Sequence, residues 1–161
     1  MLNFWAKHWL IYARKGKPHK LRKPAAKPPP AEENDGIQGP YQVTYISHSG
    51  ISETVSGGTG FQLNITLKNT GFITWSSKDK TRPVFLSYHW QDSSGNTLLY
   101  DGERTAFDHP VEPGGEAAAD LNVKTPDSRG RLVLAVDMVC EGVTWFSQTG
   151  SSMLLIPIHI S

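Results

Sequence analysis

Residues 132–146 have the sequence LVLAVDMVCEGVTWF, and this stretch decides the fold. Every second residue from Leu132 onward is apolar, which predicts an extended strand with one face in a hydrophobic core. Asp137, Cys140 and Glu141 interrupt the apolar run on or near the other face, and a glycine then marks a turn. We therefore expect a central core strand that also presents a surface.

The same two-residue alternation recurs in short runs separated by Gly, Pro, Asn and Ser. No helical period interrupts these runs after residue 40. The predicted strands cover residues 41–49, 61–69, 84–92, 97–101, 117–124 and 153–160. Short strands with turn signals about every ten residues indicate an all-β protein, an immunoglobulin-like antiparallel β-sandwich over residues 41–161.

Three tryptophans fall within the predicted sandwich. Trp90 lies on the inward face of its strand and is expected to fill the space between the sheets, and Trp75 is also expected in the core. Trp145 follows a turn, where its indole could either cap the core or serve as an exposed platform for a ligand. The sequence leaves both interpretations of Trp145 open.

The amino-terminal segment differs in composition from the rest of the chain. Residues 1–14 carry apolar side chains three and four positions apart, which predicts a short amphipathic helix. These side chains are Leu2, Trp5, Trp9 and Tyr12. Residues 15–40 are basic and rich in proline, a composition that cannot bury a core and predicts a disordered linker.

Charge is distributed unevenly along the chain. Residues 1–27 contain eight of the 16 Lys and Arg residues and no acidic residue, which leaves a net charge of −7 on the remainder. The basic segment suits an anionic membrane surface, with Trp5, Trp9, Lys15 and Lys17 as the contacts. A helix that docks on another domain, or simple disorder, explains the same residues. The acidic remainder does not suit nucleic acid, because it would not neutralise a row of phosphates.

The residues that carry chemistry form no catalytic pattern. The chain has no nucleophile elbow, zinc-binding helix motif or phosphate-binding loop, so we expect neither enzyme activity nor a cofactor. Cys140 is the single cysteine, which rules out an intrachain disulfide and a cysteine-based zinc site. It also favours a reducing compartment. We expect no metal, and a cytoplasmic location peripheral to the inner membrane.

Four segments together resemble an immunoglobulin-like domain of bacterial surface-polysaccharide proteins. The segments are LKNTGFITWS (67–76), LSYHWQDSSGNTLLYDGERT (86–105), VEPGG (111–115) and AVDMVCEGVTWFSQTG (135–150). The resemblance covers about residues 41–160. It is similar in kind to the carbohydrate-binding β-sandwich at the end of some O-antigen ABC-transporter ATPases, and distantly to four-tryptophan immunoglobulin-like domains. Cys140 departs from this pattern, which has a polar residue, often Gln, before the Glu-Gly.

The resemblance implies a non-catalytic module that recognises a bacterial surface polysaccharide or docks a glycan-assembly enzyme. The candidate ligand contacts are His89, Asp101, Arg104, Asp137, Glu141 and Trp145. In this hypothesis His89 and Glu141 bond hydroxyl groups and Trp145 stacks on a sugar, while Arg104 could instead pair with Asp101 and hold the turn. The competing hypothesis is a protein-interaction or scaffold domain that uses a sheet face or an edge strand.

Overall fold

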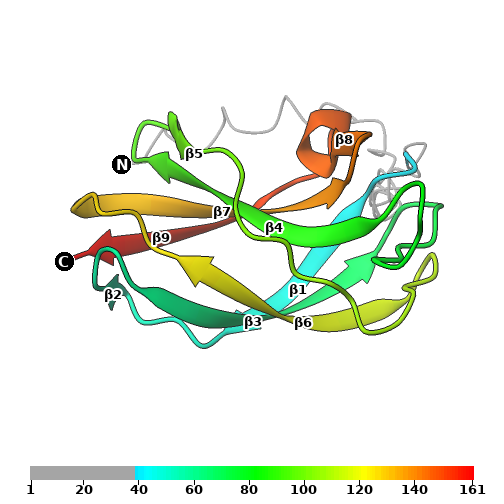
Figure 1. Cartoon of the computed structure of the whole chain (residues 1–161), viewed down its shortest axis with the longest axis horizontal. Helices are drawn as coiled ribbons and strands as arrows, with labels where there is room; N and C mark the ends of the chain where they lie inside the picture. The colour runs from blue at the N-terminus through cyan, green and yellow to red at the C-terminus, as the bar shows by residue number, and fades with distance from the viewer. Residues whose placement is uncertain (1–38) are drawn as a thin grey trace, which may run out of the picture. The chain divides into compact units, whose positions relative to one another are not determined.

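The computed structural model describes residues 39–161, which form two β-sheets packed face to face (Figure 1). One sheet has three antiparallel strands in the order β1-β3-β6. They are β1 (Val43–Ser49), β3 (Gly60–Asn69) and β6 (Glu116–Lys124). The helix predicted over residues 1–14, and residues 15–38 of the predicted linker, lie outside the described residues.

The second sheet has the strand order β2-β9-β7-β4-β5, and β8 pairs with β7. Its strands are β2 (Thr54–Val55), β4 (Val84–Asp92), β5 (Thr97–Leu99), β7 (Gly130–Cys140), β8 (Thr144–Trp145) and β9 (Leu154–Ile160). Its strand pairs are antiparallel except β2 with β9, which is parallel. A short 3₁₀ helix, η1 (Phe146–Thr149), follows β8. The predicted all-β sandwich is confirmed, with one parallel pair that the alternation did not indicate.

Strand β7 is central, because it is hydrogen-bonded to β4 on one side and to β9 on the other. Its residues at positions 132, 134, 136 and 138 belong to the core, as predicted. Cys140 also belongs to the core and is fully buried. The prediction that Cys140 lies on or near the other face is wrong, because the two-residue period of a strand carries the inward face from Met138 to position 140.

Two large side chains of β4 connect the sheets across the core. Trp90 is fully buried, as predicted, and its indole N–H donates to the carbonyl oxygen of Lys124 in β6 at 2.8 Å. The hydroxyl of Tyr88 accepts from the backbone N–H of the same Lys124 at 3.0 Å. Both backbone groups of one residue are thus satisfied from the opposite sheet. Trp75 is fully buried as well, as expected.

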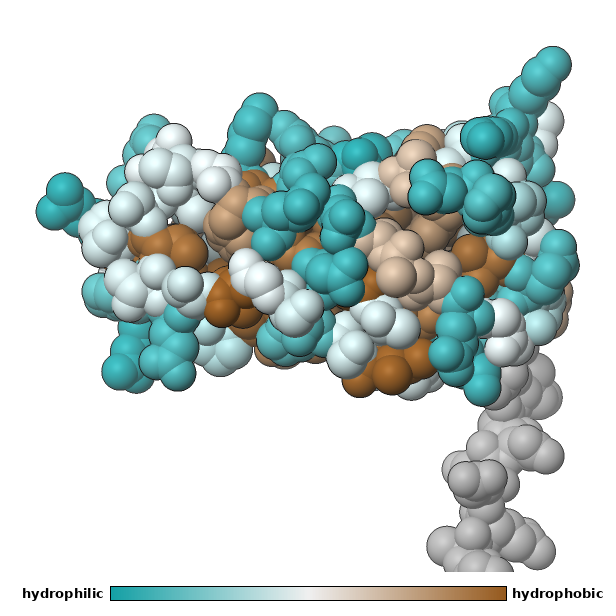
Figure 2. Space-filling view, turned by 90° about the horizontal axis from the view of Figure 1, so that it is seen from below, coloured by the Kyte–Doolittle hydropathy of each residue, from teal (hydrophilic) through white to brown (hydrophobic). Residues whose placement is uncertain are grey.

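The outer face of the three-stranded sheet is polar. Side-chain amides and a carboxylate pair across β3 and β6, with Gln62 donating to Asn122 at 3.3 Å and Asn64 to Asp120 at 2.8 Å. Figure 2 views the molecule from this side and shows hydrophilic side chains, in teal, spread among the pale and brown ones. The six predicted site residues all lie elsewhere, on the other sheet and on the segments that cover it.

Candidate functional site

A shallow pocket of about 260 Å³ opens where β7 ends. The turn after β7 and strand β8 form one wall, and the segment after β5 forms the other. The pocket is lined by Asp101, Arg104, Glu141 and Trp145, four of the six predicted contacts, together with Tyr100 and Gln148. The structure thus brings together residues that are up to 48 positions apart in a chain without a local motif.

The segment 100–104 reaches this position because it returns closely along β4. The N–H of Gly102 donates to the carbonyl of Tyr88 at 3.0 Å, and the carbonyl of Gly102 accepts from the hydroxyl of Ser87 at 3.1 Å. A Cβ atom on Gly102 would lie 2.4 Å from the Tyr88 oxygen. Only glycine permits so close an approach of two backbones, and this approach places the segment over the outer face of the sheet.

Arg104 is the cation of the pocket and is held by both carboxylates. Its Nη1 lies 2.7 Å from Oδ1 of Asp101, and its Nε pairs with Oε1 of Glu141. Nη1 also donates to the carbonyl of Gly102 at 2.8 Å and to the hydroxyl of Ser87 at 3.1 Å. Burial by itself would lower the pKa of Arg104, but the bonds to Glu141 and Asp101 outweigh that effect and raise it. The pairing with Asp101 suggested by the sequence is therefore present, and the guanidinium stays charged.

Trp145 is buried rather than displayed, with 8% of its surface exposed. The Cζ atom of Arg104 lies 4.8 Å from the centre of its ring, a cation–π contact. The ring of His89 packs against it as well, at a centroid separation of 4.3 Å. Of the two interpretations of Trp145, the structure favours the cap over the exposed platform, because neighbouring side chains already cover the indole.

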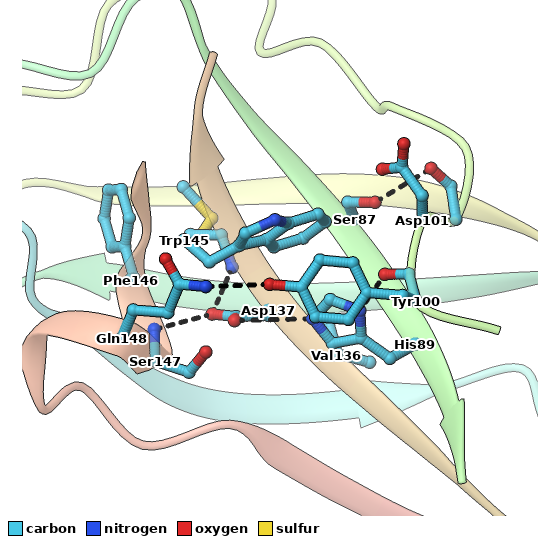
Figure 3. A network of polar contacts seen from close by, with 12 residues as sticks. Ser87, His89, Tyr100, Asp101, Val136, Asp137, Trp145, Phe146, Ser147 and Gln148 are labelled. Atoms are coloured by element: carbon cyan, nitrogen blue, oxygen red, sulfur yellow. Dashed lines mark hydrogen bonds and ion pairs between the residues drawn. The ribbon is translucent and has the colours of Figure 1, made fainter. Parts of the chain in front are cut away.

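His89 and Asp137 lie beneath the pocket and are 4% and 0% exposed (Figure 3). Nδ1 of His89 bonds the backbone carbonyl of Tyr100, and its Nε2 lies 3.6 Å from Oδ2 of Asp137. Oδ1 of Asp137 accepts from the N–H groups of Met138 at 2.7 Å and Ser147 at 3.3 Å. These two predicted contacts therefore do not reach the surface. They hold β7, η1 and the residue 100 backbone together.

The His89 contacts also say where its proton lies. A carbonyl oxygen only accepts hydrogen bonds, so Nδ1 must carry a hydrogen. A neutral ring would then turn the lone pair of Nε2 toward the buried carboxylate. Nε2 and Oδ2 lie 3.6 Å apart, and Oδ2 has no hydrogen-bond partner within residues 39–161.

The sequence reasoning missed two residues of the pocket, Tyr100 and Gln148. Tyr100 is 49% exposed, and its hydroxyl accepts from the side-chain amide of Gln148 at 2.9 Å. The available signal was the run Leu98, Leu99 and Tyr100 after a hairpin turn, three consecutive large side chains at the end of a short strand.

Cys140 borders the pocket in position but contributes its side chain to the core. Burial raises the pKa of its thiol, so the reactive thiolate is disfavoured.

Within residues 39–161 there is no group of three or more His, Cys, Asp or Glu side chains placed to hold a metal ion. In the same part of the chain no helix is long and apolar enough to cross a membrane. The predicted membrane contacts Trp5, Trp9, Lys15 and Lys17 lie outside the described residues.

No protein-family model and no curated protein sequence matches this chain. Solved structures do. The C-terminal domain of wzt superposes with a TM-score of 0.51 at 10% sequence identity, covering 77% of this chain and 75% of that one. The CARDB domain of the PF1109 protein from Pyrococcus furiosus gives a TM-score of 0.43 at 12% identity, with 78% and 93% covered. The alkylpurine DNA glycosylase AlkC of Pseudomonas fluorescens gives 0.44 at 12% identity, with 74% and 30% covered.

What the chain shares with the wzt domain is the fold. At 10% identity the side chains of a site are not carried over, so the predicted resemblance is supported for the architecture of the sandwich alone. Any ligand has to be argued from the residues of this pocket.

Proposed function

We propose that the sandwich is a non-catalytic binding module that recognises a bacterial surface polysaccharide. The observation that carries the proposal is the open pocket at the end of β7, in which an exposed tyrosine ring lies beside charged and amide side chains. An aromatic face suits the apolar C–H side of a sugar ring, and carboxylate and amide groups suit its hydroxyls. The shared fold with the C-terminal domain of wzt and the family resemblance support the same conclusion.

The proposal of a binding role rather than catalysis rests on the state of the two carboxylates. Asp101 and Glu141 both pair with the same guanidinium, and they line an open surface pocket. General acid catalysis by a carboxyl group needs a raised pKa, which burial in an apolar site provides. Asp101 and Glu141 pair with Arg104 and are 68% and 39% exposed, so neither lies in such an apolar environment.

Titration of the full chain with the surface polysaccharide of its own host tests the proposal. We expect heat of binding in calorimetry and a change in tyrosine and tryptophan fluorescence, because the ligand would contact the pocket aromatics. The substitution Tyr100→Ala is expected to abolish both signals, while its melting temperature stays within a few degrees of that of the unsubstituted protein. Absence of heat and of a fluorescence change at millimolar oligosaccharide would overturn the proposal.

A protein-interaction domain is the second candidate, favoured by the edge strand β5. Leu98 and Leu99 on this strand are 49% and 40% exposed, and the strand is paired with β4 on one side. Exposed apolar side chains on an edge strand suit the addition of a strand from a partner. In this case Leu98→Lys would weaken partner capture and leave polysaccharide binding unchanged, whereas Tyr100→Ala would do the reverse if the pocket binds sugar.

A separate proposal concerns residues 1–27, which would attach the chain to the cytoplasmic face of the inner membrane. Eight basic residues and no acid in this segment are expected to bring the chain down with anionic liposomes. The measurement is co-sedimentation as a function of salt, because screening should release the protein. Equal pelleting of a chain without residues 1–27 would remove this proposal.

A further inference from the structure

The aromatic side chains of the pocket differ in which ring has a free face. One face of Tyr100 lies against His89, with ring centroids 4.8 Å apart and planes inclined by 29°. Trp145 approaches the same ring at 69°, as an edge contact with centroids 5.5 Å apart. Because the side chain of Tyr100 is nevertheless 49% exposed, the face turned away from His89 is open. Figure 3 shows the three rings gathered together. Trp145, at 8% exposed, has no comparable free face.

The position of the open ring is also well defined. The backbone carbonyl of Tyr100 is bonded by the buried His89, and its hydroxyl is bonded by Gln148 from η1. A ring held at both its backbone and its hydroxyl loses little further freedom when a ligand stacks on it. The buried His89–Asp137 pair therefore positions the stacking surface without touching the ligand.

Arg104 has no free pair of parallel N–H donors with which to bind an acidic ligand. Its Nε is engaged by Glu141, and its Nη1 is surrounded by three acceptors, the oxygens of Asp101, Ser87 and Gly102. Recognition of a carboxylate or phosphate by arginine depends on two parallel N–H donors. A ligand carboxylate would have to displace one of the two protein carboxylates before it could bind in this way.

The charge of the pocket also disfavours an acidic ligand. The charged side chains that line it are one guanidinium and two carboxylates. Oδ2 of Asp101 and Oε2 of Glu141 make no hydrogen bond or ion pair within residues 39–161, and both side chains are partly exposed, at 68% and 39%. The pocket is therefore negative and rich in acceptors, which suits hydroxyl and ammonium donors and repels anions.

We propose that this pocket binds an uncharged or amine-bearing sugar unit and rejects carboxylated or phosphorylated ones, and that Tyr100, not Trp145, stacks on it. This inference rests on the proposed function and specifies its ligand class. It also replaces the sequence-based expectation that Trp145 is the stacking ring.

The test begins with an array of bacterial surface polysaccharides sorted into neutral, amine-bearing and acidic groups, probed with the full chain. A matched pair then isolates the charge, namely an oligouronate and the same oligosaccharide after chemical reduction of its carboxyl groups to alcohols. We expect binding to the neutral and amine-bearing groups, and at least about tenfold tighter binding to the reduced oligosaccharide than to the oligouronate in calorimetry. Added salt should narrow that difference.

Variants separate the charge from the stacking. Asp101→Asn removes the charge of a side chain that is 68% exposed. This variant should bind amine-bearing sugars more weakly, and the difference in affinity between the reduced oligosaccharide and the oligouronate should become smaller. Tyr100→Ala should abolish binding and Tyr100→Phe should retain most of it, because the ring remains. Leu98→Ser is the matched control, an equally exposed side chain that does not line the pocket.

Three outcomes would overturn different parts of the proposal. Tighter binding to the oligouronate than to its reduced form would overturn the inference while leaving polysaccharide binding in place. Full retention of binding by Tyr100→Ala would overturn the stacking assignment. No binding to any group of the array would remove the proposed function, and the inference with it.

Discussion

Replacing Trp90 by alanine is expected to lower the free energy of unfolding by about 3–5 kcal/mol, the usual loss for a large aromatic side chain removed from a core. Trp90 is fully buried between the sheets, so its removal leaves a cavity that neighbouring strands cannot close. The change also leaves the carbonyl of Lys124 without the indole donor that bonds it at 2.8 Å. Denaturant unfolding followed by circular dichroism measures the loss.

Two further variants make that experiment specific. Trp90→Phe keeps most of the apolar volume and loses the hydrogen bond, so its cost should fall clearly below that of alanine, at roughly 1–3 kcal/mol. Phe72→Ala is the matched control, because this aromatic side chain is 62% exposed and its removal should change stability by no more than about 0.5 kcal/mol. Equal losses for Trp90→Ala and Phe72→Ala would contradict the position of Trp90 in the core.

Replacing Asp137 by alanine is expected to cost a similar amount, about 3–5 kcal/mol, because it breaks a buried pair and leaves its partner uncompensated. The carboxylate is fully buried and accepts from the N–H groups of Met138 and Ser147. Its loss would also leave Nε2 of His89 without the group that faces it at 3.6 Å. The same unfolding measurement applies.

The variant Asp137→Asn keeps the shape of the side chain and removes its charge, so it separates the contributions of the two to stability. The amide oxygen of Asp137→Asn can accept from both N–H groups, and the amide nitrogen can donate to the lone pair of a neutral His89 ring. We therefore expect most of the stability to return, with a remaining loss of about 1–2 kcal/mol. A loss as large as that of the alanine variant would show that the carboxylate charge of Asp137, and not only its shape, is needed for stability.

The fold was predictable because strand alternation is a local property. The inward positions of β7 and of β4, and the burial of Trp90, follow from a two-residue period that the sequence displays. The wrong face assigned to Cys140 on β7 arose where the apolar pattern weakens near the end of the strand. The period itself would have placed the cysteine in the core.

The site was only partly predictable. Four predicted residues, Asp101, Arg104, Glu141 and Trp145, line one pocket, since they lie on the two segments that meet at the end of β7. The other two, His89 and Asp137, proved to be a buried pair, because the segment after β5 covers the outer face of the sheet at that point. Whether a polar residue on a strand is exposed depends on what crosses above it, and alternation does not contain that information.

The sequence by itself determined the all-β sandwich, its longer strands and most of their inward positions, since each follows from neighbours along the chain. Only the tertiary structure decided that Tyr100 is open and Trp145 covered, although both are large aromatics that follow turns. The physical reason is that exposure of a side chain is set by contacts between distant segments. Here Arg104 and His89 close over the indole, while His89 supports the tyrosine from beneath and leaves its outer face free.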